Sequence, residues 1–175
     1  MTSPEAGSFV GREEETSQLR LLHERPGSHI AVVYGRRRVG KTALIQEAFA
    51  KESLLVFEGL ENQSKAKQIA SFLLQIEQQS GRKIQGKSAI RGWGEALAEL
   101  VPVIKGKRIV VLFDEFQWTA NYRSELVATV KMVWERHLSR AGKVTLILCG
   151  SIASFMEKKV IRSKALYGRD RKSVV

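Results

Sequence analysis

One glycine-rich run constrains the fold of this chain more than any other feature of its sequence. Gly35-Arg-Arg-Arg-Val-Gly40-Lys41-Thr42 follows the apolar segment 29–34 directly and leads into a segment of helical periodicity. The run has the spacing G-x-x-x-x-G-K-[ST] of a phosphate-binding loop, or P-loop, which lies between a strand and a helix. Its glycines let successive backbone N–H groups point into one hollow, and the following helix adds partial positive charge there. The run therefore predicts an α/β fold with an anion site after the first strand.

The residue types at the end of this run predict its chemistry. The Lys41 ammonium would act as a catalytic point charge on the β- and γ-phosphates of a nucleotide, and the Thr42 hydroxyl would be a ligand of Mg²⁺. The predicted nucleotide contacts of the loop are Gly35, Arg38, Val39, Gly40, Lys41 and Thr42. We expect the side chains of Arg36–Arg38 to face solvent or a partner, because only their backbones form the nest. A glycine-rich turn of purely structural role is the alternative.

Strands and helices alternate along the rest of the chain, which is typical of a parallel sheet covered on both faces. The predicted strands are His29–Tyr34, Leu54–Phe57, Arg108–Phe113 and Val144–Cys149, and Lys172–Val175 is expected to begin a further one. The predicted helices are Arg12–Glu24, Gly40–Lys51, Lys65–Gln79, Trp93–Leu100 (broken near Pro102) and Arg123–Ser139, the last with an apolar stripe of Val127, Val130, Trp134 and Leu138. We therefore predict a three-layer P-loop NTPase fold with a mostly parallel sheet flanked by helices.

An acidic pair follows the third predicted strand. Asp114 and Glu115 would lie at the carboxyl edge of the sheet beside the P-loop. Asp114 would hold Mg²⁺ opposite Thr42, and Glu115 would polarise a water for attack on the γ-phosphate. Acidic residues that merely terminate a strand are the alternative. The chain lacks the N-K-x-D string with which GTPases select guanine, so the pair favours an ATPase.

A serine follows the fourth predicted strand. Ser151 would lie between the P-loop and the acidic strand, where its hydroxyl could sense the γ-phosphate through a hydrogen bond. The alternative is an N-cap for the helix that follows.

Composition excludes several classes of protein. The 175 residues contain a single cysteine, Cys149, and three histidines, too few for a disulfide framework or a usual structural zinc site. No apolar run is long enough to span a membrane, and the first residues lack a signal peptide's pattern. We expect one domain in the cytoplasm without a membrane segment.

The chain is strongly basic. Its 29 Lys+Arg and 18 Asp+Glu give a formal charge of +11. Such an excess is compatible with nucleic acid, with an anionic membrane surface or with a phosphorylated small ligand. DNA or a protein partner at the basic surface is the partner we expect, and a solvated face without a partner is the alternative.

Five strings of the sequence together resemble a known family. They are Phe9-Val-Gly-Arg-Glu-Glu14, Val33-Tyr-Gly-Arg-Arg-Arg-Val-Gly-Lys-Thr42, Leu112-Phe-Asp-Glu-Phe-Gln-Trp118, Leu148-Cys-Gly-Ser151 and Leu166-Tyr-Gly-Arg169. In this order they resemble the archaeal-type ATPases of the STAND/AAA+ branch of P-loop NTPases. The resemblance implies ATP and Mg²⁺ as ligands and ATP hydrolysis as the activity.

The resemblance also implies residues that the spacing does not predict. Val10 and Gly11 would contact adenine through their backbones, and Arg12 would hold that segment. From the residues alone, Phe9 could equally be a hydrophobic staple of the next helix.

The resemblance also implies a role for an arginine near the C-terminus. Arg169, with Arg171 in reserve, would be a catalytic arginine that stabilises charge at the γ-phosphate, in the same chain or across an oligomer. An exposed basic residue is the alternative.

The resemblance ends where the chain ends. Family members continue through a fifth strand and a lid, so we expect residues 1–175 to be a single P-loop ATPase core domain without the lid and the following domain. Three functions stay open: an ATP-hydrolysing switch, a nucleotide-binding module without effective hydrolysis, and a basic nucleic-acid-binding protein.

Overall fold

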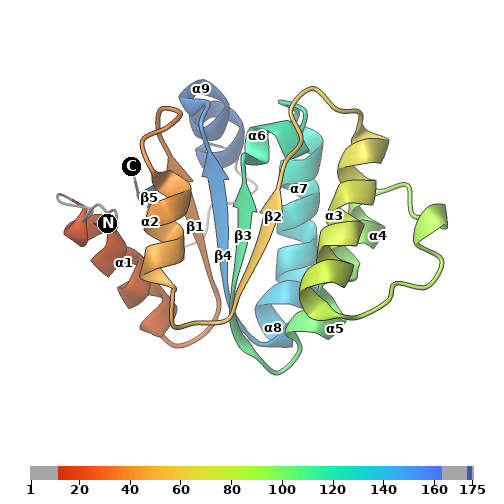
Figure 1. Ribbon diagram of the computed structural model, residues 1–175, viewed down its shortest axis with the longest axis horizontal. Helices are drawn as coiled ribbons and strands as arrows, with labels where there is room; N and C mark the ends of the chain where they lie inside the picture. The colour runs from red at the N-terminus through yellow and green to blue at the C-terminus, as the bar shows by residue number, and fades with distance from the viewer. Residues whose placement is uncertain (1–11, 163–172, 175) are drawn as a thin grey trace, which may run out of the picture.

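A parallel sheet forms the centre of the fold. The computed structural model describes residues 12–162 and 173–174. Within that part the sheet has five strands in the order β2-β3-β4-β1-β5, and every pairing is parallel (Figure 1). The strands are β1 (His29–Tyr34), β2 (Leu54–Glu58), β3 (Arg108–Asp114), β4 (Lys143–Gly150) and β5 (Ser173–Val174). The four principal predicted strands are confirmed to within a residue at each end, and the expected beginning of a further strand is present beside β1.

Helices cover both faces of the sheet. The α-helices are α1 (Glu13–Glu24), α2 (Lys41–Ala48), α3 (Lys65–Ser80), α4 (Trp93–Ala98), α5 (Val101–Ile104), α6 (Phe116–Thr119), α7 (Ser124–Val133), α8 (Ser139–Ala141) and α9 (Ala153–Phe155). A 3₁₀ turn, η1 (Lys87–Ala89), and two π-helical segments, η2 (Trp134–Leu138) and η3 (Met156–Ile161), complete the described elements. In Figure 1, α1 and α2 lie left of the sheet, and α3, α4 and α7 lie right of it. None of the described helices is both long and apolar enough to cross a membrane.

The alternation of side chains along β3 explains why its apolar run is uninterrupted. Val110 and Leu112 pack into the cluster formed with α1 and α2, whereas Val111 and Phe113 pack into the larger cluster on the other face. Both faces of the strand are therefore buried, as expected for a parallel sheet between two helical layers.

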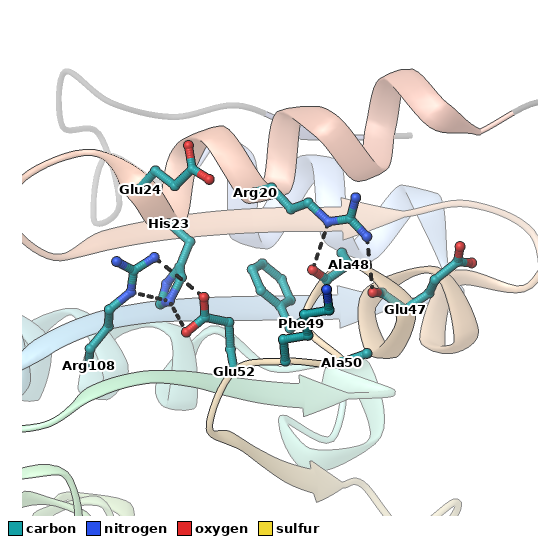
Figure 2. Close-up of a pocket in the computed structure, with 10 residues that line it drawn as sticks. Arg20, His23, Glu24, Glu47, Ala48, Phe49, Ala50, Glu52 and Arg108 are labelled. Atoms are coloured by element: carbon teal, nitrogen blue, oxygen red, sulfur yellow. Dashed lines mark hydrogen bonds and ion pairs between the residues drawn. The ribbon is translucent and has the colours of Figure 1, made fainter.

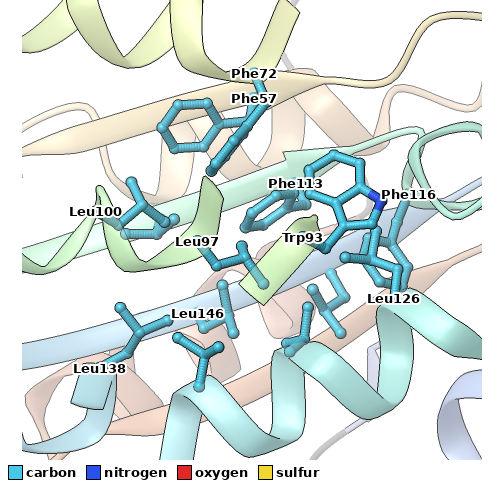
Figure 3. Packing of buried hydrophobic residues seen from close by; sticks show 14 of the residues in the cluster. Phe57, Phe72, Trp93, Leu97, Leu100, Phe113, Phe116, Leu126, Leu138 and Leu146 are labelled. Carbon is cyan, nitrogen blue, oxygen red and sulfur yellow. The ribbon is translucent and has the colours of Figure 1, made fainter. Parts of the chain in front are cut away.

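Aromatic packing in the larger cluster holds the end of β3. The Phe113 ring stacks on Phe72 with centroids 5.6 Å apart and meets Phe116 edge to face at 6.1 Å (Figure 3). Phe113 and Phe116 are both buried in the same core. Because they flank Asp114 and Glu115, their burial fixes the acidic pair at the carboxyl edge of the sheet.

One helix prediction needs correction. The segment predicted as one helix over 123–139 leaves α-helical geometry after Val133 and makes the π-turn η2 before α8. Val133 and Leu138 are both buried, whereas Trp134 is only partly so. Leu138 follows Val133 by five positions, the i to i+5 spacing that a π-turn brings onto one face. The predicted break near Pro102 is confirmed, since α4 ends at Ala98 and a new helical turn, α5, begins at Val101 with Pro102 in its first turn, where no N–H is needed.

Candidate active site

The glycine-rich run forms the loop between β1 and α2. Arg38 and Gly40 take left-handed conformations, with φ of 63° and 81°, and α2 begins at Lys41. The Lys41 side chain is only 7% exposed and folds back across the loop, where its Nζ donates to the carbonyls of Gly35 (3.0 Å) and Arg36 (2.8 Å). The loop therefore lies between a strand and a helix, as a P-loop does. The Lys41 ammonium is bound to the carbonyl groups of the loop itself.

The sheet order brings three strand ends together beside this loop. β4 pairs with β1 on one side and β3 on the other, so the residues after all three strands share the carboxyl edge. The Thr42 hydroxyl donates to Asp114 Oδ2 over 2.6 Å, and the Glu115 N–H donates to Asp114 Oδ1 over 2.9 Å. The hydroxyl and the carboxylate predicted as metal ligands are thus in direct contact, across 72 residues of sequence.

This pair of oxygen donors fits Mg²⁺. The ion takes oxygen ligands and is usually held by one or two protein groups, with waters and substrate phosphates completing its octahedron. Thr42 and Asp114 offer that small donor set at the N-terminus of α2. Their role as metal ligands stays a prediction.

Glu115 leaves the strand in a left-handed conformation, with φ of 48°. Its carboxylate Oε2 accepts two hydrogen bonds, one from Ser151 Oγ at 2.7 Å and one from Gln117 Nε2 at 2.5 Å. The predicted base and the predicted sensor are therefore hydrogen-bonded to each other. Ser151 does not cap the following helix, since α9 has Ile152 at its N-cap and no side-chain cap, so that alternative is wrong.

Sequence reasoning missed Gln117. Its side chain is fully buried, with an exposed fraction of 0%, and it joins Glu115 to the end of β4. The only sequence signal is an amide between two apolar aromatic residues, Phe116 and Trp118, directly after the acidic pair. That pattern predicts burial without revealing what the amide contacts.

Arg37 also has contacts that the sequence did not reveal. Its side chain is 57% exposed, as expected, yet its guanidinium lies over the Trp118 ring at 4.9 Å and forms an ion pair with Glu61 at 3.6 Å. The loop is therefore tied to α6 and to the segment between β2 and α3 within the same chain.

Several predicted residues lie outside the described part of the chain. These are Phe9, Val10, Gly11, Arg169 and Arg171. Arg12 is described and stands at the N-cap of α1, where it makes no side-chain cap hydrogen bond.

A separate hollow of about 320 Å³ opens at the opposite, amino edge of the sheet (Figure 2). Its lining includes three cationic side chains (Arg20, Lys51 and Arg108) and three carboxylates (Glu24, Glu47 and Glu52). Because these charges balance, the hollow has no excess charge with which to select an anion. The P-loop edge is the better candidate for an active site.

His23 lines this hollow and is almost fully buried. Its Nε2 accepts a hydrogen bond from Arg108 Nε at 3.0 Å and also lies 3.4 Å from Glu52 Oε2. Its Nδ1 is 2.8 Å from Thr145 Oγ1. Burial, and next the positive charge of Arg108, hold the pKa of His23 below its ordinary value, although Glu52 opposes the shift. The group is a structural link between α1, β3 and β4.

Comparisons with known proteins bear on the fold and the family of this chain. A protein of Methanocaldococcus jannaschii, MJECL04, to which no function is assigned, is 27% identical over 162 residues, covering 92% of this chain and 34% of the relative. Among solved structures, the Walker-type ATPase PABY2304 of Pyrococcus abyssi has a TM-score of 0.59 at 20% identity, over 94% of this chain and 52% of that one. The ORC2 protein of Aeropyrum pernix, solved as ADPNP-ADP complexes, has a TM-score of 0.60 at 22% identity, over 99% and 50%.

These likenesses differ in what they show. The chain spans about a third of the length of the relative and about half of the length of each solved structure. At such low identity the solved structures show a shared P-loop NTPase fold. The sequence also matches, over residues 9–175, the family described as an ATPase domain predominantly from Archaea. Because that match covers nearly the whole chain, the protein belongs to this archaeal-type ATPase domain family.

Proposed function

We propose that this chain binds Mg-ATP at the carboxyl edge of its sheet and hydrolyses it. The observation that carries the proposal is the hydrogen bond of 2.6 Å between Thr42 Oγ1 and Asp114 Oδ2, because it joins the phosphate loop to the acidic strand. Membership of an ATPase-domain family supports the same activity. The ADPNP and ADP of the Aeropyrum pernix structure are nucleotides of the class proposed here.

In the proposed complex the loop amides and Lys41 hold the phosphates. In the structure the Lys41 ammonium donates hydrogen bonds to the carbonyl oxygens of Gly35 and Arg36. In the complex it would turn to the β- and γ-phosphates and so exchange neutral acceptors for charged ones. Val10 and Gly11 would hold the adenine. A Mg²⁺ ion held by Thr42 and Asp114 would supply positive charge to the phosphate oxygens.

Hydrolysis requires a base near the γ-phosphate. Glu115 would accept a proton from a water whose oxygen attacks the γ-phosphorus while the bond to the ADP oxygen breaks. Ser151 would report the state of the γ-phosphate to this carboxylate, since its hydroxyl contacts Glu115 Oε2 at 2.7 Å. Arg169, from the same chain or from a second copy, would stabilise the charge that develops in the transition state.

The resemblance to the STAND branch suggests what the cycle serves. ATP binding and release would switch the conformation of the domain, and the basic surface would bind DNA or a protein partner. These outputs rest on the nucleotide site, so the site is tested first.

The test compares Lys41→Ala with Lys67→Ala, which removes an exposed lysine of α3. Mg-ATP titrated by calorimetry should bind the wild type and Lys67→Ala alike. Lys41→Ala should bind at least about tenfold more weakly, because hydrogen bonds to charged groups contribute about 1.5–3 kcal/mol. Equal affinity of Lys41→Ala, with an unchanged circular dichroism spectrum, would overturn the proposed pocket. Tight binding by the wild type without phosphate release would leave a nucleotide-binding module instead of an ATPase.

A further inference from the structure

The Gln117 side chain occupies the interior between the first turn of α6 and the end of β4. Its exposed fraction is 0%. A buried amide costs free energy unless its polar atoms find hydrogen-bond partners, so the partners of this amide define its role.

Within the described part of the chain, the hydrogen bonds of this amide all reach Ser151 or Glu115. Gln117 Oε1 accepts from the backbone N–H of Ser151 at 3.2 Å. Its Nε2 donates to Ser151 Oγ at 3.1 Å and to Glu115 Oε2 at 2.5 Å. A backbone N–H can only donate, so it requires Oε1 on its own side and turns Nε2 toward the glutamate. The backbone N–H of Ser151, directly after β4, thereby sets which group of the amide faces Glu115.

The surrounding chain leaves room for this arrangement. A Cβ atom added at Gly150 would lie 2.8 Å from Gln117 Oε1 and 2.5 Å from Met156 Sδ. Any side chain at residue 150 would therefore displace the amide or the methionine. Phe116 and Trp118, on either side of Gln117, are buried and hold α6 in place.

The two hydrogen bonds to Glu115 leave its second oxygen available. Both donors reach Oε2, and among the residues that the structure describes no hydrogen bond reaches Oε1. A carboxylate anchored through one oxygen presents the other in a defined direction, which is what a base needs to accept a proton from a water. We propose that Gln117 is a positioning residue that holds the Glu115 carboxylate for water activation. This inference rests on the proposed ATP hydrolysis.

The test is a pair of matched substitutions. Gln117→Met removes the amide and keeps an unbranched side chain of similar size. Gln68→Met does the same to another buried glutamine, 2% exposed, whose amide binds the Leu60 backbone. Gln117→Met should lower kcat roughly 10- to 100-fold, the range expected for a misplaced catalytic group. Its Kd for Mg-ATP should stay within about twofold of the wild type, since the amide of Gln117 makes its hydrogen bonds to Glu115 and Ser151 and makes none to residues 35–42.

A double-mutant cycle separates positioning from a structural role. In a Glu115→Gln background, Gln117→Met should cause no further loss of kcat, because the group that it positions is already gone. A structural role would lower kcat by the same factor in both backgrounds and would overturn the inference. If Gln117→Met does not fold, as judged by its thermal midpoint against Gln68→Met, Gln117→Asn retains the amide on a shorter side chain and takes its place.

Failure of the inference differs from failure of the proposed function. Unchanged kcat in Gln117→Met, together with lost hydrolysis in Glu115→Gln, would reject only the role of Gln117. Normal hydrolysis in Glu115→Gln would reject the proposed base, and the inference would fall with it.

Discussion

Thr42 and Asp114 are 72 residues apart in sequence, and their side-chain oxygens are 2.6 Å apart in the structure. Thr42 lies in the first turn of α2, and Asp114 is the last residue of β3. β4, which pairs with both β1 and β3, sets the separation of these elements. The contact is therefore a product of the sheet order, and it places a hydroxyl and a carboxylate where a Mg²⁺ ion bound to a nucleotide would need them.

Removing the Thr42 hydroxyl should uncouple nucleotide binding from Mg²⁺. Thr42→Val keeps the shape of the side chain and loses the oxygen, so we expect ATP affinity to become nearly independent of Mg²⁺. Thr42→Ser keeps the oxygen and should behave as the wild type does. Titrations of ATP with Mg²⁺ and with EDTA measure the difference. Full Mg²⁺ stimulation in Thr42→Val would show that the hydroxyl is not a ligand.

Glu115→Gln should retain Mg-ATP binding and lose hydrolysis. A general base contributes about 10²–10⁴-fold to a rate, and a neutral amide cannot accept the proton. Phosphate release under saturating Mg-ATP measures the loss. Glu135→Gln, which alters an exposed glutamate of η2, is the control and should hydrolyse at the wild-type rate.

Trp118 should report nucleotide binding by its fluorescence. The Arg37 guanidinium from the P-loop lies over its ring at 4.9 Å, so a rearranged loop changes the surroundings of the indole. We expect Mg-ATP to change tryptophan emission in the wild type and to leave it unchanged in Trp118→Phe. Arg37→Gln should reduce the change while binding persists. An equal change in Trp118→Phe would assign the signal to Trp93 or Trp134.

The buried His23 should make the fold less stable in mild acid. Its folded-state pKa lies below the ordinary value of 6.5, so the unfolded chain takes up the proton first. Above about pH 6.5 His23 should not lower the free energy of unfolding, and below that pH the free energy of unfolding should fall as the pH drops. Arg108 and Lys143 oppose protonation in the folded state, and Glu52 favours it.

Urea unfolding at pH 7.5 and at pH 5.5 measures this dependence. The loss of stability between the two should be smaller in His23→Gln than in the wild type. The control His137→Gln alters an exposed histidine of η2 and should keep the wild-type loss. An identical pH dependence in His23→Gln would show that His23 does not carry the effect.

Local sequence patterns were enough to predict much of the fold. The strands are continuous apolar runs, which a sheet buried on both faces requires, and the P-loop spacing needs a strand before it and a helix after it. The proximity of Thr42, Asp114 and Ser151 followed from the same logic, since parallel strands end at one edge.

Other features depend on contacts that no local pattern encodes. Arg108 donates to His23 across 85 residues, and Gln117 reaches Ser151 across 34. The π-turn η2 is not encoded locally either, because the apolar stripe of Val127, Val130, Trp134 and Leu138 fits an uninterrupted α-helix equally well, and Trp134 still packs against the core. Tertiary packing decided each of these.

The most direct test of the central claim is a crystal structure with Mg²⁺ and a non-hydrolysable ATP analogue. We expect the β- and γ-phosphates to lie against the backbone amides of residues 38–42, with the Mg²⁺ ion between Thr42 and Asp114. Nucleotide bound at another surface, or a metal ion that contacts neither of these residues, would contradict it.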